Sequence, residues 1–359
     1  MRIGLIIYGS LDTLTGGYLY DRLLVEHLRR QGDQVEIISL PWRTYARHLS
    51  DNLSPSLVRH LRRAALDVLL QDELNHPSLV WLNRRLRRDM RYPLVAVVHL
   101  LRCSEPRPAW RNRLYRWVET RYLNSVDGFT FNSQTTRAAV ENLVGSHRPG
   151  VVAYPGRDHL PSTLTPEQIA ARARQSGPLR LLFVGNLTPL KGLHIVLQAL
   201  TALPPDACRL TVVGSLTMAP TYVCAVRRQM AQAELNGRVV LLGVLPNAEV
   251  ATHLAQSHVL AVPSFYEAFG IAYLEAMSCG LPVIASTAGA AHELITHGRE
   301  GFLVSPGDTA ALAQHVRALS QDRECLLRMS LAAYRRAMAH PTWAESAGAI
   351  RELLRTLVR

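Results

Sequence analysis

Two glutamates eight positions apart, Glu267 and Glu275, are the residues whose type and spacing most directly suggest chemistry. Glu267 follows an apolar run, Val259–Val262, that predicts a strand, and a helix is expected to begin near Phe269-Gly270. Open α/β sheets bind ligands at the carboxyl ends of their strands, so both carboxylates are expected at that edge. Carboxylates hold hydroxyl groups, and the N–H groups of a helix start hold oxyanions. The segment therefore predicts a site for a sugar attached to a diphosphate.

The chain has a single lysine among its 40 basic residues, and this Lys191 lies in a turn bounded by Gly185 and Gly192. Arginine is a wide planar fork whereas lysine is a compact point charge, so the two are not interchangeable at a crowded phosphate. The turn stands between an expected strand over 179–184 and a helix expected from Leu193. This position favours a phosphate-binding lysine over a chance lysine on a solvated surface.

The segment from Pro263 to Ile284 resembles the active-site segment of the family 4 glycosyltransferases. The resemblance rests on the Glu-x7-Glu spacing, on Phe-Gly after the first acid, and on Cys-Gly-Leu-Pro-Val at 279–283. Enzymes of this family have the GT-B fold and retain the anomeric configuration of the sugar. The resemblance implies a hexosyltransferase-type enzyme that uses a nucleotide diphosphate sugar. No cofactor is expected, and no metal, since the chain has no Asp-x-Asp motif for a metal-bound diphosphate.

A second family pattern, Gly-Arg…Lys-Gly, supplies two cations to the donor diphosphate. Gly185, Lys191 and Gly192 match this pattern, but Asn186 stands where the arginine is usual. Either Asn186 donates neutral hydrogen bonds to the diphosphate, or another residue supplies the missing charge.

The resemblance implies a role for each matching residue. Glu275 would hold ribose hydroxyl groups, and Glu267 with the backbone after it would hold the donor sugar. The catalytic residues implied are His99, Lys191 and Glu267. The donor-binding residues implied are Gly16, Gly17, Gly185, Asn186, Lys191, Val244, Leu245, Glu267, Ala268, Phe269, Gly270, Ile271 and Glu275.

Two features of the first half carry part of this interpretation. Gly16-Gly17 follows the first expected strand, so its backbone can approach a phosphate or a sugar without a Cβ clash; a flexible turn is the alternative. His99 ends the apolar strand 94–98 at the ligand edge of its sheet. The family has an active-site histidine that contacts the donor sugar there, and a structural histidine is the alternative.

Three other segments are expected to surround the ligand. Arg102 and Glu105 either complete a polar wall near His99 or pair with each other at the surface. The turn 243–246 follows a strand and is placed to face the nucleotide base. The stretch 288–295 resembles the family's segment after the active loop and is interpreted as bracing the donor-binding domain.

Strand-like and helix-like segments alternate along the whole chain, which predicts parallel sheets in two doubly wound, Rossmann-like domains. The expected strands are 3–8, 34–40, 94–98, 128–131, 179–184, 209–213, 239–242, 259–262, 282–285 and 301–304. The expected helices are 18–30, 135–144 and 222–233, those from Leu193, Asn247 and Phe269, and 343–358.

A stretch rich in Pro and Gly, 154–178, reads as the connection between the two domains. The expected bounds are 1–165 for an acceptor-side domain and 178–342 for the donor-binding domain. In GT-B folds the last helix crosses back, so 343–359 is expected to complete the first domain.

The net charge is +12, and residues 1–150 hold 22 arginines against 14 acidic residues. Arginines alternate with Leu and Trp in 57–66, 82–91 and 110–121. Such a surface suits anionic lipid headgroups; an ordinary solvated, arginine-rich face is equally compatible. Nucleic acid is not expected as a partner, because no recognition motif accompanies the charge.

Length, cysteines and hydropathy bound the class of protein. The 359 residues suffice for two cored domains, and the five cysteines are scattered, as in reduced cytosolic proteins. The apolar start, 1–8, reads as a strand rather than a secretion signal, and no run reaches the ~18 apolar residues of a membrane span. A cytoplasmic location is expected, extended to peripheral contact at the inner membrane face.

Two alternatives to a glycosyltransferase stay open at this point, and so does the identity of the acceptor. One is another GT-B enzyme, such as a nucleotide-sugar epimerase or a phosphorylase. Another is a basic membrane- or nucleic-acid-binding protein with a vestigial sugar fold. Within the glycosyltransferase interpretation, the acceptor classes considered are a membrane lipid, a lipid-linked acceptor and a polysaccharide precursor. The choice among them stays open, because the loops 10–20, 40–60 and 100–115 contain no motif that identifies the acceptor.

Overall fold

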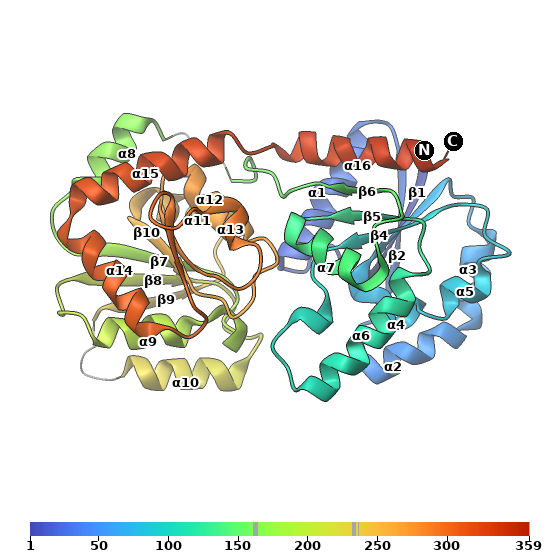
Figure 1. Ribbon diagram of the computed structural model, residues 1–359, viewed down its shortest axis with the longest axis horizontal. Helices are drawn as coiled ribbons and strands as arrows, with labels where there is room; N and C mark the ends of the chain where they lie inside the picture. Colours follow the sequence, from blue (N-terminus) through green and yellow to red (C-terminus); the bar gives the residue numbers. More distant parts are fainter. Residues whose placement is uncertain (161–163, 232–234, 236, 359) are drawn as a thin grey trace. The chain divides into compact units, whose positions relative to one another are not determined.

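Parallel β-strands form the framework of the chain, in two separate sheets of six strands each (Figure 1). The computed structural model describes residues 1–160, 164–231, 235 and 237–358. The chain divides into a first unit, Met1–Pro155 with Thr342–Arg359, and a second unit, Gly156–Pro341. The first unit thus takes its last helix from the far end of the sequence.

The first unit has the strand order β2-β1-β3-β4-β5-β6. Its strands are β1 (Arg2–Tyr8), β2 (Gln34–Leu40), β3 (Val68–Asp72), β4 (Leu94–Val98), β5 (Gly128–Phe131) and β6 (Gly150–Val152). β2 is added on one side of β1, and β3 to β6 are added on the other. The chain therefore reverses the direction of strand addition between β1 and β3, which makes a topological switch point.

The helices of the first unit connect these strands. They are α1 (Gly16–Arg30), α2 (Tyr45–Ser50), α3 (Pro55–Arg63), α4 (His76–Leu79), α5 (Leu82–Leu86), α6 (Ala109–Leu123), α7 (Gln134–Val144) and α16 (Trp343–Val358). Short 3-10 helices are η1 (Asp51–Leu53), η2 (Glu73–Asn75) and η3 (Arg102–Ser104). α16 packs on α1, where Ile350 and Leu354 are buried and Arg351 pairs with Asp33 at 2.6 Å.

The second unit has the strand order β12-β11-β10-β7-β8-β9. Its strands are β7 (Leu179–Val184), β8 (Cys208–Val213), β9 (Val239–Gly243), β10 (Val259–Val262), β11 (Val283–Ser286) and β12 (Gly301–Val304). β7, β8 and β9 extend the sheet one way, and β10, β11 and β12 extend it the other way. The switch point here lies between β7 and β10, which are neighbouring parallel strands with Val259 opposite Leu181.

The helices of the second unit complete the alternation. They are α8 (Pro166–Ala173), α9 (Leu193–Thr201), α10 (Pro220–Met230), α11 (Asn247–Gln256), α12 (Ile271–Ser278), α13 (Ala291–Leu294), α14 (Thr309–Gln321) and α15 (Arg323–Met338), with the 3-10 helix η4 (Pro189–Lys191). In α8 the buried Arg172 donates to the carbonyls of Ala255, Cys279 and Gly280 at 2.8–3.0 Å. α8 is therefore an integral part of this unit.

The structure confirms the two parallel sheets and corrects several boundaries. α1 begins at Gly16 rather than Tyr18, and α12 begins at Ile271 rather than Phe269. The expected connection 154–178 contains α8. Ala233, expected near the end of a helix, lies outside the described residues, and α10 ends at Met230. None of the helices in the described ranges has the length and hydropathy needed to cross a bilayer.

Candidate active site

Lys191 and Glu267 meet at the switch point of the second sheet. Lys191 ends η4, which follows β7, and Glu267 lies in the loop that follows β10. Because β7 and β10 are parallel neighbours, their carboxyl ends bring these two segments together. The Lys191 Nζ lies 2.6 Å from Glu267 Oε2, and the two side chains are 29% and 15% exposed. The pair is thus ordered by the fold and still reachable from solvent.

The loop carrying Glu267 is tied to the lysine turn by further contacts. Ser264 Oγ donates to the same Glu267 oxygen at 3.1 Å, and the Phe265 N–H donates to the Leu190 carbonyl at 2.7 Å. Gly192 has φ +74°, and a Cβ there would lie 2.5 Å from the Pro263 carbonyl oxygen. Only glycine fits this close approach, which explains the Lys-Gly sequence.

The segment 288–290 braces Glu267 from the other side. The Glu267 N–H donates to the Ala288 carbonyl at 3.2 Å, and the Ala290 N–H donates to the Glu267 carbonyl at 2.8 Å. Between them Gly289 has φ +95°, and a Cβ there would lie 2.0 Å from the Glu267 carbonyl oxygen. The backbone position of Glu267 therefore depends on this glycine.

α12 begins beside this pair, with its first turn preceded by a glycine. Gly270 has φ +94°, and a Cβ there would lie 2.2 Å from the Tyr273 ring. Within the described part of the chain, no side chain caps this helix start. Phe269 is 2% exposed, so its ring belongs to the core of the unit. The segment from Ala268 to Ile271 thus connects Glu267 to the first turn of α12.

Glu275 lies just over one turn into α12, the helix that follows the Glu267 loop. Its side chain is partly buried, and burial raises its pKa to about 8. Among the residues that the structure describes, none forms a hydrogen bond or ion pair with its carboxyl group. A desolvated carboxyl group without a partner is suited to accept and donate hydrogen bonds to hydroxyl groups.

Glycine-containing turns at the ends of β7, β8 and β9 contact one another at this edge of the sheet. A Cβ on Gly214 would lie 2.0 Å from the Gly185 carbonyl oxygen, and the Gly214 N–H donates to the Gly243 carbonyl at 2.8 Å. Asn186 Oδ1 accepts the Ser215 N–H at 3.3 Å. The amide oxygen of Asn186 is thus engaged with the neighbouring turn.

The turn after β9 presents its two expected base-contacting residues differently. Val244 is 55% exposed, and Leu245 is partly buried. They follow the edge strand of the sheet, at the same carboxyl edge as Lys191 but two strands away. An apolar, open turn at this place offers a surface for a flat ring.

In the first unit, His99 lies against the start of α1. A Cβ on Gly17 would lie 3.3 Å from His99 Cδ2, so the histidine ring rests over this glycine. Neither Gly16 nor Gly17 has a positive φ, and both belong to the first turn of α1 rather than to a loop before it. Gly17 therefore serves close approach rather than an unusual backbone conformation.

The buried Asp21 forms an ion pair with His99. His99 Nε2 lies 2.9 Å from Asp21 Oδ1, and the Asp21 side chain is fully buried. Burial disfavours the charged imidazole, but Asp21, with Asp72 and Glu73 behind it, outweighs that effect and raises the pKa of His99 to about 9. These carboxylates therefore favour the charged form of His99.

Arg102 and Glu105, which follow His99 in the sequence, do not form an ion pair with each other. Glu105 forms its ion pair with Arg107 rather than Arg102. The Arg102 guanidinium lies over the rings of Tyr45 and Tyr115, at 5.2 and 5.0 Å. The surface pairing of Arg102 with Glu105 is therefore wrong.

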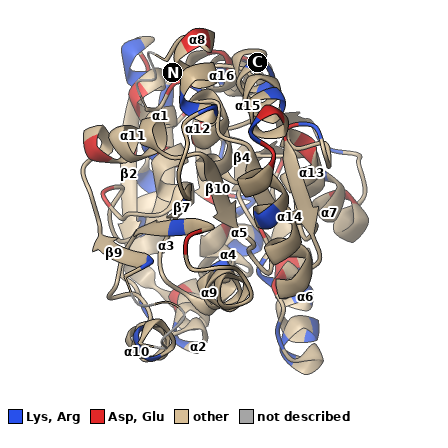
Figure 2. Cartoon of the chain, turned by 90° about the vertical axis from the view of Figure 1, so that its left-hand side faces the viewer, with Lys and Arg blue, Asp and Glu red and all other residues tan. Residues whose placement is uncertain are grey.

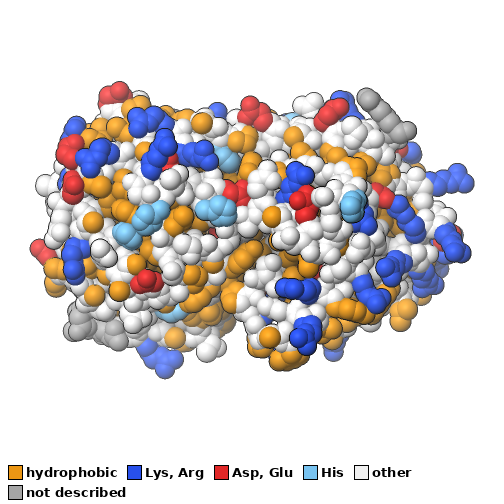
Figure 3. Space-filling model, in the orientation of Figure 1, with side chains coloured by type: hydrophobic (Ala, Val, Ile, Leu, Met, Phe, Trp, Pro, Cys, Tyr) orange, Lys and Arg blue, Asp and Glu red, His pale blue; other side chains and the backbone are white. Residues whose placement is uncertain are grey.

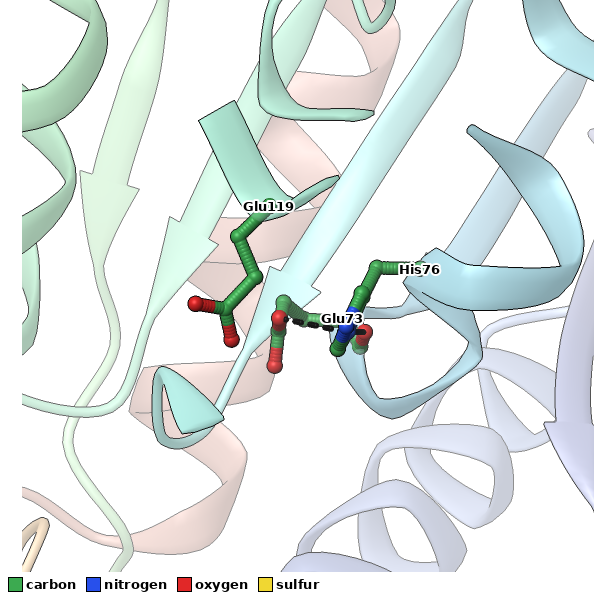
Figure 4. A group of neighbouring side chains, drawn as sticks. All are labelled: Glu73, His76 and Glu119. Carbon is green, nitrogen blue, oxygen red and sulfur yellow. Dashed lines mark hydrogen bonds and ion pairs between the residues drawn. The ribbon is translucent and has the colours of Figure 1, made fainter. Parts of the chain in front are cut away.

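The turn after His99 is anchored by a buried group of Glu73, His76 and Glu119 (Figure 4). Glu119 accepts the backbone N–H groups of Arg102 and Cys103 at 2.5 and 3.1 Å. Figure 4 shows the carboxyl groups of Glu73 and Glu119 pointing toward one another. Burial raises the pKa of Glu73 to about 8 and that of Glu119 to about 7, so the pair retains a proton at neutral pH.

These three side chains are close enough to share a metal ion, since their ligand atoms lie within 4.8 Å of one another. His76 Nε2 lies 3.0 Å from the Tyr45 hydroxyl, and Nδ1 lies 3.0 Å from the Glu73 carbonyl. Both ring nitrogens of His76 therefore already face a hydrogen-bond partner. The arrangement fits a hydrogen-bonded network that shares a proton rather than a metal centre.

Lys191, Glu267 and the backbone 268–271 thus come together within the second unit, and Gly16, Gly17 and His99 come together within the first. Sequence reasoning missed Asp21, Ser264 and the specific role of Gly289. Asp21 lies four residues after Gly17, on the same side of a helix, and this spacing was the available signal.

Two family models and several known glycosyltransferases match the sequence of this chain. The family model for Glycosyl transferases group 1 matches residues 165–336, and that for Glycosyltransferase Family 4 matches residues 20–159. A D-inositol 3-phosphate glycosyltransferase of Pseudarthrobacter chlorophenolicus is 30% identical over 266 residues, which are 71% of this chain and 61% of that relative. A glycogen synthase of Mycobacterium tuberculosis is 31% identical over 48% of this chain and 42% of its own length. The chain thus spans less than two thirds of these relatives.

Solved structures share the fold over almost the whole chain. A sucrose-phosphate synthase from Thermosynechococcus elongatus has a TM-score of 0.81 at 21% identity, covering 99% of this chain and 98% of that one. HepE of Anabaena, solved in complex with UDP-glucose, has a TM-score of 0.78 at 22% identity, covering 99% and 100%.

Proposed function

Since the chain belongs to the family 4 glycosyltransferases and has their GT-B fold of two Rossmann-like domains, we propose that it transfers a sugar from a nucleotide diphosphate to an acceptor hydroxyl with retention of configuration. The observation that carries this proposal is the ion pair of Lys191 and Glu267 at the switch point. A cation for phosphate and a carboxylate for sugar hydroxyls stand side by side where such sheets bind ligands.

The proposed roles at the diphosphate follow from hydrogen-bonding capacity. The Lys191 ammonium has three donors, so it can keep its bond to Glu267 and also meet a phosphate oxygen. Asn186 Oδ1 accepts the Ser215 N–H, and we propose that the Asn186 amide is a neutral donor toward the diphosphate. Charge growing on the leaving diphosphate is the kind of change that such preorganised donors stabilise strongly. With these donors in place we propose a reaction that needs no metal.

The proposed roles at the sugars rest on the carboxyl groups and the histidine. Glu267 accepts hydroxyls of the donor sugar, and the carboxyl group of Glu275 binds the ribose. We also propose His99, which pairs with Asp21 in the first domain, as a catalytic residue. In this scheme the leaving phosphate takes the acceptor proton, so a separate general base is not required.

A uridine donor is the first to test. HepE, which shares the fold, was solved with UDP-glucose. We propose that the turn with the exposed Val244 and the partly buried Leu245 faces the base.

We propose a hydroxyl of a membrane lipid, a lipid-linked intermediate or a polysaccharide precursor as the acceptor, with the enzyme in the cytoplasm and peripherally bound to the inner membrane face. The arginine excess of the first domain supports the membrane setting. The curated relatives add one candidate class, because their names specify D-inositol 3-phosphate.

The test is a thermal-shift panel of UDP-, GDP- and ADP-sugars without added metal, followed by detection of released nucleotide. One nucleotide sugar should raise the melting temperature of the wild type but not of Glu275→Ala. Glu249→Ala is the matched control, because Glu249 is an exposed acid on α11 of the same domain. It should respond like the wild type.

Other results would redirect the interpretation. A shift lost equally in both variants would remove Glu275 from the site. Interconversion of the nucleotide sugar without an acceptor would indicate an epimerase, and visible absorbance of a lysine-bound cofactor would indicate a phosphorylase. No shift with any donor would leave a binding protein with a vestigial fold.

A further inference from the structure

The three arginine-rich stretches of the first domain differ in where their apolar residues lie. In α3, Leu57 and Leu61 are buried in the core, and in α5, Leu82 and Leu86 are fully buried. The apolar residues of these two helices therefore hold the domain together. Their arginines form an ordinary solvated face.

α6 is different, because its apolar residues face outward. Trp110 is 66% exposed, Leu114 48% and Trp117 46%. Their spacing of four and three residues places them in one stripe along the helix. On the inner side Val118 and Tyr122 are buried. The stripe is thus a second apolar face, additional to the one that packs on the core.

Arginines flank this stripe on both sides. The Arg111 guanidinium lies 5.0 Å from the Trp110 ring centroid, and that of Arg121 lies 4.1 Å from the Trp117 ring. Arg113 and Arg116 are exposed between them. Figure 2 shows basic positions recurring along α6, and Figure 3 shows hydrophobic and basic side chains side by side on the surface of this domain.

The sequence of α6 places no acidic residue on this stripe. The single acid of α6, Glu119, is buried and accepts the backbone N–H groups of the turn after β4. The outer face of α6 therefore combines tryptophan, leucine and arginine without a compensating carboxylate. Tryptophan and arginine together match the chemistry of a lipid headgroup layer, which is apolar on one side and anionic on the other.

We propose that the outer face of α6, defined by Trp110, Leu114 and Trp117 with Arg111, Arg113 and Arg116, docks the protein on an anionic lipid bilayer. The tryptophans and the leucine enter the headgroup layer, and the arginines meet lipid phosphates. The inference deepens the proposed function by naming the element that contacts the membrane, and it rests on that function only for its setting. Docking itself requires neither donor nor turnover.

The test is cosedimentation of the whole chain with vesicles of phosphatidylcholine, alone or mixed with phosphatidylglycerol. The wild type should bind the mixed vesicles and not the neutral ones. A triple variant, Trp110→Ala with Leu114→Ala and Trp117→Ala, should bind at least tenfold more weakly. Because the three side chains are exposed, its melting temperature should equal that of the wild type.

A charge-matched pair of variants separates local docking from diffuse attraction. Arg111→Gln with Arg113→Gln and Arg116→Gln removes three charges from the α6 face. The control removes three charges from exposed arginines elsewhere in the same domain, Arg59, Arg63 and Arg88, each changed to Gln. The first should lose binding at least tenfold, and the second should lose less than threefold.

Several outcomes would overturn the proposal. Equal losses in the two charge variants would indicate a diffuse basic surface, and binding of neutral vesicles would remove the role of charge. Binding of duplex DNA with the same dependence on α6 would indicate a polyanion site instead. Donor-induced thermal shifts should be unchanged in all these variants; if donors fail while vesicle binding persists, the proposed transferase activity fails and the docking surface stands.

Discussion

Replacing Gly289 with alanine tests whether the position of Glu267 is set by the segment 288–290. A Cβ at Gly289 would lie 2.0 Å from the Glu267 carbonyl oxygen, and Cβ contacts under 3.0 Å essentially do not occur. The Glu267 backbone must therefore retreat by about 1 Å, the size of misplacement that lowers an enzymatic rate ~10²-fold. We expect Gly289→Ala to reduce kcat by roughly that factor.

The same change should lower the free energy of unfolding. A non-glycine residue at positive φ costs about 1–2 kcal/mol. The retreat also weakens the two backbone hydrogen bonds that flank Gly289, each contributing about 1 kcal/mol. The expected loss is ~2–4 kcal/mol, measured by urea denaturation.

Gly298→Ala is the matched control for this variant. Gly298 also has a positive φ, +82°, but nothing lies within 4 Å of a Cβ placed there. It should show the backbone penalty of about 1–2 kcal/mol and an unchanged kcat. Equal effects of the two substitutions on kcat, or wild-type turnover by a folded Gly289→Ala protein, would refute the idea that this glycine positions Glu267.

Three further outcomes are expected from single substitutions. Lys191→Ala should lower the rate of sugar transfer ~10²–10³-fold, about 3–4 kcal/mol, because it removes a cation from developing phosphate charge; Lys191→Arg should recover most of that rate if charge alone matters, and wild-type turnover by the alanine variant would exclude the role. Asp21→Asn should lower the pKa of His99 from about 9, which an NMR titration of the imidazole would detect, and an unchanged titration would show that Asp21 does not hold the charge. Folding raises the pKa of Glu73 from 4.5 to about 8, so the native state binds the extra proton and wild-type stability falls as pH rises between these values. Glu73→Gln should flatten that fall in urea denaturation at pH 5 and pH 8, and an unaltered slope would contradict the assignment.

The strands that the sequence located well are those buried on both faces. β4 and β10 are continuous apolar runs and β7 is apolar except for Arg180; all three are bounded by Pro, Gly or His, and their predicted bounds agree with the structure. β3 was missed because its three apolar residues, Val68–Leu70, follow a helix-like pattern without a clear break. Local pattern alone does not separate such a strand from the end of the preceding helix.

The sequence indicates which residues are candidates for the site, but it does not indicate which of them contact one another. Lys191 and Glu267 stand out in the sequence, but their 2.6 Å contact depends on β10 being the neighbour of β7. Asp21 and His99 are likewise brought together by the sheet, 78 residues apart. Strand order is a property of the whole domain, so contacts that depend on it cannot be read from local spacing.

The return of α16 to the first domain sets an order for biosynthesis. α16 covers α1 through Ile350, Leu354 and the Arg351–Asp33 pair, yet it leaves the ribosome only after all of the second domain. At about 5–20 residues per second, the stretch between β6 and α16 takes roughly 10–40 s to synthesise. During that interval the side of α1 that α16 will cover is bare on the nascent chain, while the second domain can fold as one continuous segment. The first domain starts folding earlier and finishes later, and chaperones have that window in which to shield it.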